Sequence, residues 1–338
     1  MERPATQRAF DLDLIRAIAL GCILVVHFNA AVTGYFTLPH KLFASVLPFG
    51  IYLGDLGSSL FFMVSGAALA LTATPDQSPL AFYRRRSKAV YPLFWLAWAS
   101  CFAVRFVARP GAFAGAKTPT LLLTVLGIDQ FAQAGGWVAQ DFACVGEWFL
   151  GSILFLYLLF PWLQRALHKN LWLTWAVALL LSVPVHCMGW DAKLVAVHLP
   201  EFLFGMCTLR LRGKAKAACA AVLGLAAVLL RQVDAKLFCA AVSALVFLVL
   251  SMLAPRLDCT LLRRFCAWLA RYSYPVFLLH HVIVLRLAAC FDLAALSRRD
   301  TAFLFAIYLA ASFVAAQGLL WAYRKLQTAL AAGCKAAS

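Results

Sequence analysis

The sequence predicts an all-α protein: a polytopic membrane helix bundle of about ten transmembrane helices. Hydrophobic residues make up 64% of the 338 residues and charged residues only 13%, whereas soluble chains carry about 25% charged residues. The mean hydropathy is +0.85. At about 20 residues per span, ten spans use about 200 residues and leave about 138 for loops and ends. We therefore expect one integral membrane domain over residues 1–338 and no soluble domain.

Ten apolar runs are suitable spans. They lie at residues 12–32, 52–72, 90–108, 146–163, 170–186, 194–210, 216–231, 236–254, 272–290 and 302–323. If the N-terminus is cytoplasmic, these spans place 19 of the 30 Lys and Arg residues inside and nine outside, with Arg16 and Arg286 within spans. The excess inside satisfies the positive-inside rule. The sequence therefore predicts ten spans with both termini cytoplasmic.

A shorter apolar run, 118–131, would reverse the sidedness of every later loop if it crossed the membrane. We expect it to be an interfacial or re-entrant piece of an outer loop, 109–145, that turns at Gly135 and Gly136. The first eight residues lack the pattern of a cleaved signal, so we expect the first helix to be retained.

The formal net charge of +16 indicates cytoplasmic loop charge in a membrane protein, and not a nucleic-acid partner. The 11 cysteines show no CxxC pair and no metal-ligand spacing with histidine. We interpret them as small buried hydrophobic residues and expect no metal site.

Ionisable residues in the first span need an explanation, because each costs about 2.5–3.5 kcal/mol at the centre of a membrane helix. Arg16 and His27 are eleven residues apart, which is about three helical turns, so they share a face about 16 Å apart along the axis. Asp13 lies one turn before Arg16 and can pair with it. The alternative is that Asp13 and Arg16 anchor the cytoplasmic end and that His27 is a packing residue.

Five motifs follow one another along nearly the whole chain. They are FDLDLIRAIA (10–19) with VVHF (25–28), SLFFMVSG (59–66), FYRRR (82–86) with Tyr91-Pro92, GEW (146–148) with LYLLFP (156–161), and YSYPVFLLH (272–280). Together they resemble the membrane acyltransferase 3 family, in whose opening motif an Arg and a His are separated by ten residues.

The resemblance implies an O-acyltransferase that moves an acyl group, usually acetyl, from cytoplasmic acyl-CoA to a hydroxyl of a cell-surface polysaccharide or lipid-linked glycan. It implies an enzyme of the bacterial cytoplasmic (inner) membrane, with acyl-CoA as co-substrate and no permanently bound cofactor. His27 would be the general base or a covalent acyl relay. Arg16 would hold an anionic part of the donor or orient the catalytic face.

Arg84, Arg85 and Arg86, in a cytoplasmic loop before the third span, suit the phosphates of acyl-CoA. They would equally satisfy the positive-inside rule without a ligand. Many family members carry a second Arg three residues after the position of Arg86, where this sequence has Ala89; Lys88 would substitute partly.

Many members also have a Glu five residues after the Trp matched by Trp148, where this chain has Ile153. Glu147, just before Trp148, would replace that Glu and would orient His27 or contact the acceptor. Alternatively, Glu147 would only cap the start of its helix. Trp148, Asp13 and His280 are candidate substrate-binding residues, with His280 as a second polar wall of the cavity or a packing residue.

Other ionisable residues have structural interpretations. Glu201 would form a buried ion pair with Arg286, whereas His40, His168, His186 and His198 would anchor the chain at the membrane interface. Two other functions remain open. A secondary transporter or exporter would use Arg16 and His27 as a proton-coupled site, and a non-catalytic subunit of an assembly complex would tolerate loss of both.

Overall fold

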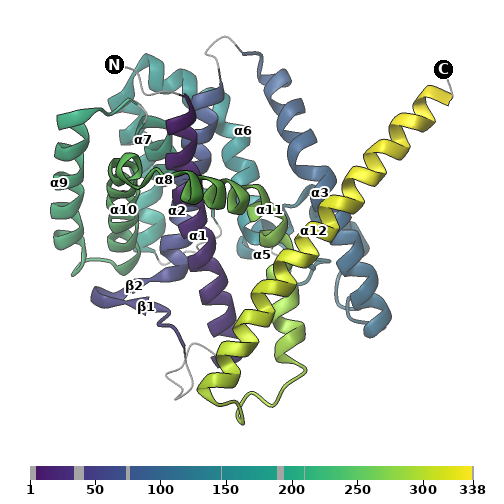
Figure 1. Cartoon of the computed structure of the whole chain (residues 1–338). Helices are drawn as coiled ribbons and strands as arrows, with labels where there is room; N and C mark the ends of the chain where they lie inside the picture. The colour runs from purple at the N-terminus through teal and green to yellow at the C-terminus, as the bar shows by residue number, and fades with distance from the viewer. Residues whose placement is uncertain are drawn as a thin grey trace. The chain divides into compact units, whose positions relative to one another are not determined.

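The computed structural model describes residues 5–33, 42–73, 77–145, 147–188, 194–208 and 210–336. Within them the chain forms twelve α-helices and one two-stranded hairpin (Figure 1). The elements are α1 (Ala5–Thr33), β1 (Val46–Leu47), β2 (Ile51–Tyr52), α2 (Leu53–Thr72), α3 (Pro79–Ala108), α4 (Leu121–Leu126), α5 (Asp129–Ala134), α6 (Glu147–Lys169), α7 (Leu171–Cys187), α8 (Val195–Thr208), α9 (Gly213–Leu230), α10 (Ala235–Leu257), α11 (Thr260–Ala288) and α12 (Arg298–Ala336), with 3-10 turns η1 (Pro48–Gly50) and η2 (Thr118–Thr120).

Each of the ten predicted spans overlaps one helix: α1, α2, α3 and α6 to α12. By length and composition, seven of the described helices can cross a membrane: α1, α2, α3, α6, α9, α10 and α12. Helices α7 and α8 are shorter, and α11 carries Arg263, Arg264 and Arg271 in its first half. The predicted all-α membrane bundle is confirmed, while the number of ten spans and the cytoplasmic termini stay predictions.

The chain divides into two compact units. The first contains Met1–Val26, Phe43–Pro79 and Phe149–Arg271, and the second contains His27–Leu42, Leu80–Trp148 and Tyr272–Ser338. Each unit is described by itself below.

Helix α2 forms the centre of the first unit. It packs against α8 and α10, while α9 packs on α10 and α7 on α8 (Figure 1). The core joins Leu60 and Met63 of α2, which are fully buried, to Ile15 of α1 and Phe247 of α10. The hairpin β1–β2 pairs Val46 with Tyr52 and leads directly into α2.

Two glycines allow α2 and α8 to approach closely. A Cβ atom at Gly66 would overlap the backbone carbonyl oxygen of Phe202, and one at Gly205 would overlap that of Met63. Small residues at such positions let helix backbones touch, which is how membrane helices gain packing energy without a hydrophobic effect. The last residue of the SLFFMVSG motif therefore has a packing function.

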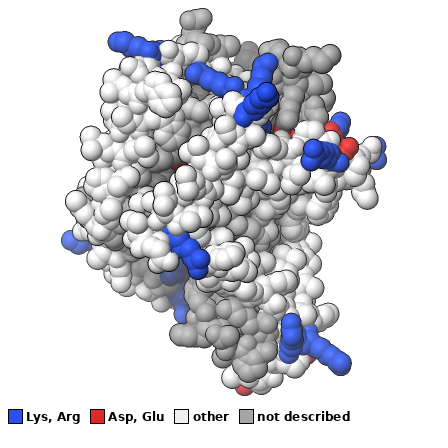
Figure 2. Space-filling view, turned by 90° about the vertical axis from the view of Figure 1, so that its left-hand side faces the viewer, with Lys and Arg blue, Asp and Glu red and all other residues white. Residues whose placement is uncertain are grey.

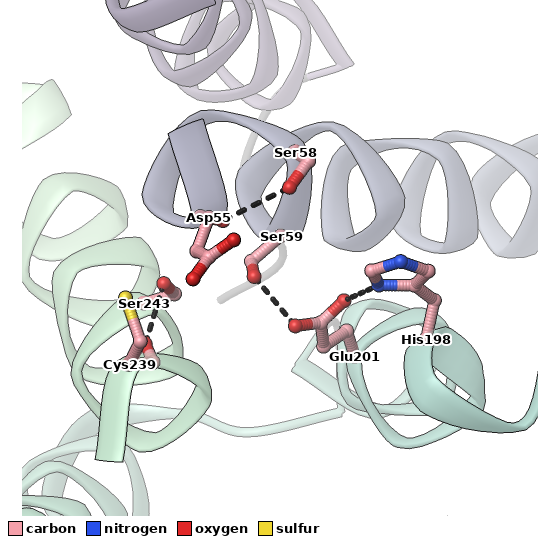
Figure 3. A network of polar contacts seen from close by, with 7 residues as sticks. All are labelled: Asp55, Ser58, Ser59, His198, Glu201, Cys239 and Ser243. Atoms are coloured by element: carbon pink, nitrogen blue, oxygen red, sulfur yellow. Dashed lines mark hydrogen bonds and ion pairs between the residues drawn. The ribbon is translucent and has the colours of Figure 1, made fainter. Parts of the chain in front are cut away.

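The same helix pair shares buried polar contacts, shown in Figure 3. Ser59 donates to the Glu201 carboxylate, whose other oxygen lies 2.7 Å from His198 Nδ1. His198 stacks on Phe62 with ring centroids 4.0 Å apart. The prediction that His198 is an interfacial anchor is therefore wrong: it is buried. Glu201 has partners within its own unit, and its predicted ion pair with Arg286, in the other unit, stays a prediction.

Several helices of the first unit present apolar side chains outward. Trp172 of α7 is 81% exposed and Val228 of α9 is 68% exposed. Figure 2 shows a face that is broadly uncharged between groups of Lys and Arg. Such surfaces suit lipid rather than water.

The second unit joins α3, α12, the last turns of α1 and the part of α11 from Tyr272 onward. Phe28 of α1 packs edge-to-face on Phe305 of α12 and stacks with Tyr308. The Tyr274 hydroxyl of α11 donates to the Val90 carbonyl of α3. The aromatic contacts hold the end of α1, and thus His27, against α12, and the hydrogen bond joins α11 to α3.

Residues 118–131 form η2, α4 and the start of α5. The two α-helices have six residues each, about 9 Å, and neither can cross a hydrocarbon core of about 30 Å. Trp95 Nε1 donates to the Val125 carbonyl and the Tyr91 hydroxyl to the Leu126 carbonyl. Tyr91 and Trp95 lie about 20–26 Å along α3 from its end at Ala108, so α4 packs beside the middle of α3. The interfacial or re-entrant placement of this segment stays a prediction.

Every terminal carbonyl of α4 has a partner. The N–H groups of Ile128 and Gly127 donate to the Leu123 and Thr124 carbonyls. The side chains of Trp95 and Tyr91 donate to the remaining two carbonyls, those of Val125 and Leu126. A turn of this kind at the end of a helix needs a residue in the left-handed backbone conformation. Gly127 has this conformation, with φ +72°. The expected turn after α5 is also present, with Gly136 at φ +73°.

We predict that Gly205→Ala destabilises the first unit by about 1–3 kcal/mol, because α2 and α8 must separate to admit the methyl group. Thermal unfolding of the purified protein in detergent measures the effect. The matched control is Gly21→Ala, since nothing lies within 4 Å of a Cβ built there. Equal unfolding temperatures for the two variants would contradict the close helix contact.

We predict that Trp95→Phe loosens the segment that contains α4, because the Val125 carbonyl loses its donor, and a carbonyl within the membrane would find no water to replace it. Faster alkylation of Cys144, measured by peptide mass spectrometry, reports the change. Trp172→Phe is the control, since that side chain is exposed. Unchanged Cys144 reactivity in Trp95→Phe would count against a stabilising contact between α3 and α4.

Candidate active site

Three histidines meet in the second unit. The ring centroid of His27, near the end of α1, lies 4.9 Å from that of His280 and 5.1 Å from that of His281 on α11. Both contacts are edge-to-face. The structure thus brings together two residues that the sequence analysis selected, His27 and His280, and adds His281, which it did not.

Hydrogen bonds define the tautomer of His280. Its Nδ1 lies 3.1 Å from the Val276 carbonyl oxygen and 2.8 Å from that of Phe277. Carbonyls only accept hydrogen bonds, so Nδ1 carries the proton and Nε2 carries a lone pair. The Nε2 atom is buried and has no hydrogen-bond partner in the described residues. A free imidazole lone pair therefore lies beside His27.

These histidines line a cavity of about 660 Å³, a size typical of small-molecule sites. Its walls are mainly apolar and aromatic, with Phe277 of α11 and Trp148 among them. Ser100 of α3 and Gln130 of α5 add neutral polar groups. The predicted substrate-binding residues Trp148 and His280 therefore lie on one cavity with His27.

The polypeptide that follows α5 forms a further wall. It contributes Ala143, Cys144 and Val145 to the cavity. Two side chains of α3 hold it: Trp98 Nε1 donates to the Phe142 carbonyl at 2.9 Å, and Arg105 donates to the Ala143 carbonyl at 3.2 Å. Trp98 and Arg105 are seven residues apart, so they share a face of α3.

Burial acts on one acidic side chain next to this wall. Asp129, at the first position of α5, is fully buried. This burial, with a smaller contribution from the nearby Asp141 carboxylate, raises the pKa of Asp129 to about 6. Its neighbour Gln130 reaches Asp141 through its side-chain amide.

The predicted ion pair at the start of α1 is present. Arg16 Nη1 lies 3.1 Å from the Asp13 carboxylate, and both side chains are about three-quarters buried. They belong to the first unit, whereas His27 belongs to the second. All three lie on one unbroken helix, α1. The roles of Asp13 and Arg16 in substrate binding and catalysis stay predictions.

The candidate donor-binding residues lie on a helix and not, as expected, in a loop. Arg84, Arg85, Arg86 and Lys88 occupy the first turns of α3, which begins eleven residues before the predicted span. On a helix, Arg84 and Lys88 share a face, while Arg86 points to the other side. Arg86 is half-buried and lies over the Phe82 ring at 5.8 Å. Arg84 and Lys88 are exposed and form the better pair for one phosphate.

The side chain of Glu147 lies outside the described residues, as does Gly146, so the prediction for Glu147 stays as it was. Arg105, Arg109 and Arg286 line the cavity although the sequence analysis did not select them. The only sequence signal was their position near the ends of spans, where basic residues normally mark sidedness.

No group in the described residues has the arrangement of three or more His, Cys, Asp or Glu side chains that would hold a metal ion. Among the described cysteines, Cys239 and Cys266 are buried as expected, but Cys187, Cys259 and Cys290 are exposed. The site therefore offers imidazoles, guanidinium groups and neutral polar groups for chemistry.

Comparison with known families adds an independent result. A family described as an acyltransferase domain, acyltransferase 3, matches residues 10–321, which is most of the chain and includes both units. Comparisons with curated proteins and with solved structures give no match. The chain belongs to the acyltransferase 3 family and is a membrane acyltransferase.

Proposed function

We propose that the protein transfers an acyl group, usually acetyl, from acyl-CoA to a hydroxyl of a cell-surface polysaccharide or lipid-linked glycan. It would act in the bacterial cytoplasmic membrane as part of cell-envelope glycan modification. The main support is the cavity in which His27 faces His280 and His281. An imidazole is the side chain best suited to take a proton from a hydroxyl near neutral pH.

The proposed chemistry needs only the groups in this cavity and the two substrates. A nitrogen of His27 takes the hydroxyl proton while the hydroxyl oxygen attacks the thioester carbonyl carbon. The carbon–sulfur bond then breaks, and the CoA thiolate leaves and takes the proton from His27. In the relay alternative, a nitrogen of His27 attacks the thioester carbon, and the CoA thiolate leaves with the imidazole proton. The acceptor hydroxyl then attacks the acyl-imidazole, the carbon–nitrogen bond breaks and the hydroxyl proton returns to His27.

His280 would act on His27 as a positioning residue. Its Nδ1–H is committed to the backbone carbonyls of Val276 and Phe277, which fixes the ring and directs the Nε2 lone pair away from them. A hydrogen bond from His27 to this lone pair would hold the His27 ring and leave its second nitrogen for the acceptor hydroxyl.

Donor binding would use the opposite end of α3. Arg84 and Arg105 are 21 residues apart on this helix, which corresponds to about 31 Å and thus to the whole hydrocarbon core. The basic cluster of α3 would hold the phosphates of CoA on the cytoplasmic side. The acyl end of the donor must then extend toward His27, so the phosphates and the reacting carbon bind at different depths.

We predict that His27→Ala abolishes acyl transfer, because the acceptor proton has no base and the acyl group no relay. The measurement is incorporation of label from labelled acetyl-CoA into surface glycan, in cells and in proteoliposomes with extracted glycan. His168→Ala is the matched control, since His168 is exposed.

His27→Ala must insert in the membrane at the normal level for the result to count. Undiminished transfer would contradict the assignment of His27. Movement of unmodified glycan across the vesicle membrane, with no covalent label, would instead support the transporter interpretation.

We predict that Arg84→Gln with Lys88→Gln raises KM for acetyl-CoA by about tenfold or more, as expected for loss of charge-assisted hydrogen bonds. KM for acetyl-pantetheine, which lacks the nucleotide phosphates, stays unchanged. Arg165→Gln, on α6, is the control for loss of a basic residue. Parallel changes in KM for both donors would contradict phosphate binding by Arg84 and Lys88.

A further inference from the structure

The cavity with the three histidines also contains three arginines. Arg105 and Arg109 are four residues apart along α3 and just beyond it, where the Arg109 N–H still donates to the Arg105 carbonyl. Arg286 lies in the last turn of α11. In the described part of the chain, no Asp or Glu lines this cavity. The described residues that line the cavity therefore carry a positive charge with no acidic side chain among them.

Neutral groups, not acids, orient Arg105. The Arg105 guanidinium donates to the Ala143 carbonyl and lies over the Phe113 ring, 4.7 Å from its centroid. No ion pair joins Arg105, Arg109 or Arg286 to an acidic side chain of the described residues. Both contacts of Arg105 leave its positive charge available to a ligand.

The arginines lie at a fixed offset from the histidines. Arg286 follows His281 by five residues and His280 by six on α11, which corresponds to about 8–9 Å along the helix axis. An anionic group at Arg286 would therefore be separated from a hydroxyl at His27 by roughly this distance. One acceptor molecule can extend over both positions.

The CoA phosphates are a poor match for these arginines if Arg84 and Lys88 hold them, because Arg84 and Arg105 are about 31 Å apart along α3. A neutral acceptor needs no cation at all. All three arginines are exposed, so a ligand that enters the cavity can reach them. The observations therefore favour a second anion, carried by the other substrate.

We propose that the acceptor is acidic, and that Arg105, Arg109 and Arg286 bind its carboxylate or phosphate group while the hydroxyl to be acylated lies at His27. The identity of the reaction rests on the proposed function above. Binding of the anion does not, so it can be tested without turnover.

Cys101 and Cys144 line the cavity and give a direct readout. The purified full-length protein, in nanodiscs of phosphatidylcholine, is treated with N-ethylmaleimide, and the alkylation of each cysteine is followed by peptide mass spectrometry. The probes are glucuronate and glucose 1-phosphate, with glucose as the neutral match. Alkylation of the buried Cys239 and Cys266 would indicate unfolding. Alkylation of the exposed Cys259 shows that the reagent remains active.

We predict that one or both anionic sugars slow alkylation of Cys101 and Cys144 by about tenfold when present at about ten times the dissociation constant. Glucose has no such effect. In Arg109→Gln with Arg286→Gln the protection is lost, whereas Arg298→Gln with Arg299→Gln, which removes two charges outside the cavity lining, retains it. Arg105→Lys retains the charge but loses the guanidinium fork, and we expect intermediate protection.

Equal protection by glucose, or protection that survives loss of Arg109 and Arg286, would overturn the proposal. Protection that appears only with phosphatidylglycerol in the nanodisc would also overturn it, because the anion would then be a lipid headgroup. If the anionic sugars protect but His27→Ala retains acyl transfer, anion binding stands and the proposed role of His27 fails. If His27→Ala abolishes transfer but no anion protects, only the acidic acceptor is rejected.

Discussion

The absence of water in the hydrocarbon core is the constraint on which this structure depends, because every backbone polar group at that depth must find a partner in the protein. The long helices meet the requirement internally. Helix α4 cannot, since a six-residue helix leaves its last four carbonyls without helical partners. Two of these carbonyls accept hydrogen bonds from the backbone of the turn at Gly127. The other two accept hydrogen bonds from the side chains of Tyr91 and Trp95 on α3. These contacts hold α4 in place against α3.

The segment that contains α4 and α5 in turn shapes the cavity. It carries Gln130 to one wall, and the chain that leaves it supplies Ala143 and Cys144 to another. Because Trp98 and Arg105 bind the carbonyls of that stretch, α3 fixes both the segment and its exit. Helix α3 thus carries three groups of residues along its length. Exposed basic residues lie at its start, aromatic hydrogen-bond donors in its middle and arginines that line the cavity at its end.

The fold was largely predictable from the sequence, for a physical reason. An apolar run of about 20 residues in a membrane has no alternative to a helix, so all ten predicted spans fall on helices. The start of α3 was missed because Arg84 to Lys88 lower the hydropathy while the helix continues. The short α4 and α5 were predicted only as a re-entrant or interfacial piece, since their partners on α3 are some 30 residues away in sequence.

Site residues were predictable from the sequence only where their contacts lie within one helical turn or where they belong to a motif. The Asp13–Arg16 pair follows from one helical turn, and His27 and His280 from the motifs that contain them. The burial of His198 depends on Phe62 and Glu201, and its stacking on a residue of another helix leaves no trace in the local sequence. Arg105 and Arg286 resemble ordinary residues at span ends. Only the tertiary structure shows that they share a cavity with the histidines.

An acidic acceptor would link binding to chemistry. Proton transfer to His27 creates a positive charge in a cavity that already holds three guanidinium groups and, among its described lining residues, no acid. At an effective dielectric constant of about 20, one charge at about 9 Å opposes that new charge by about 2 kcal/mol. A bound carboxylate or phosphate would offset part of this repulsion. His27 would then be most effective as a base when the correct substrate is present, because the acceptor itself supplies a negative charge that the described lining residues lack.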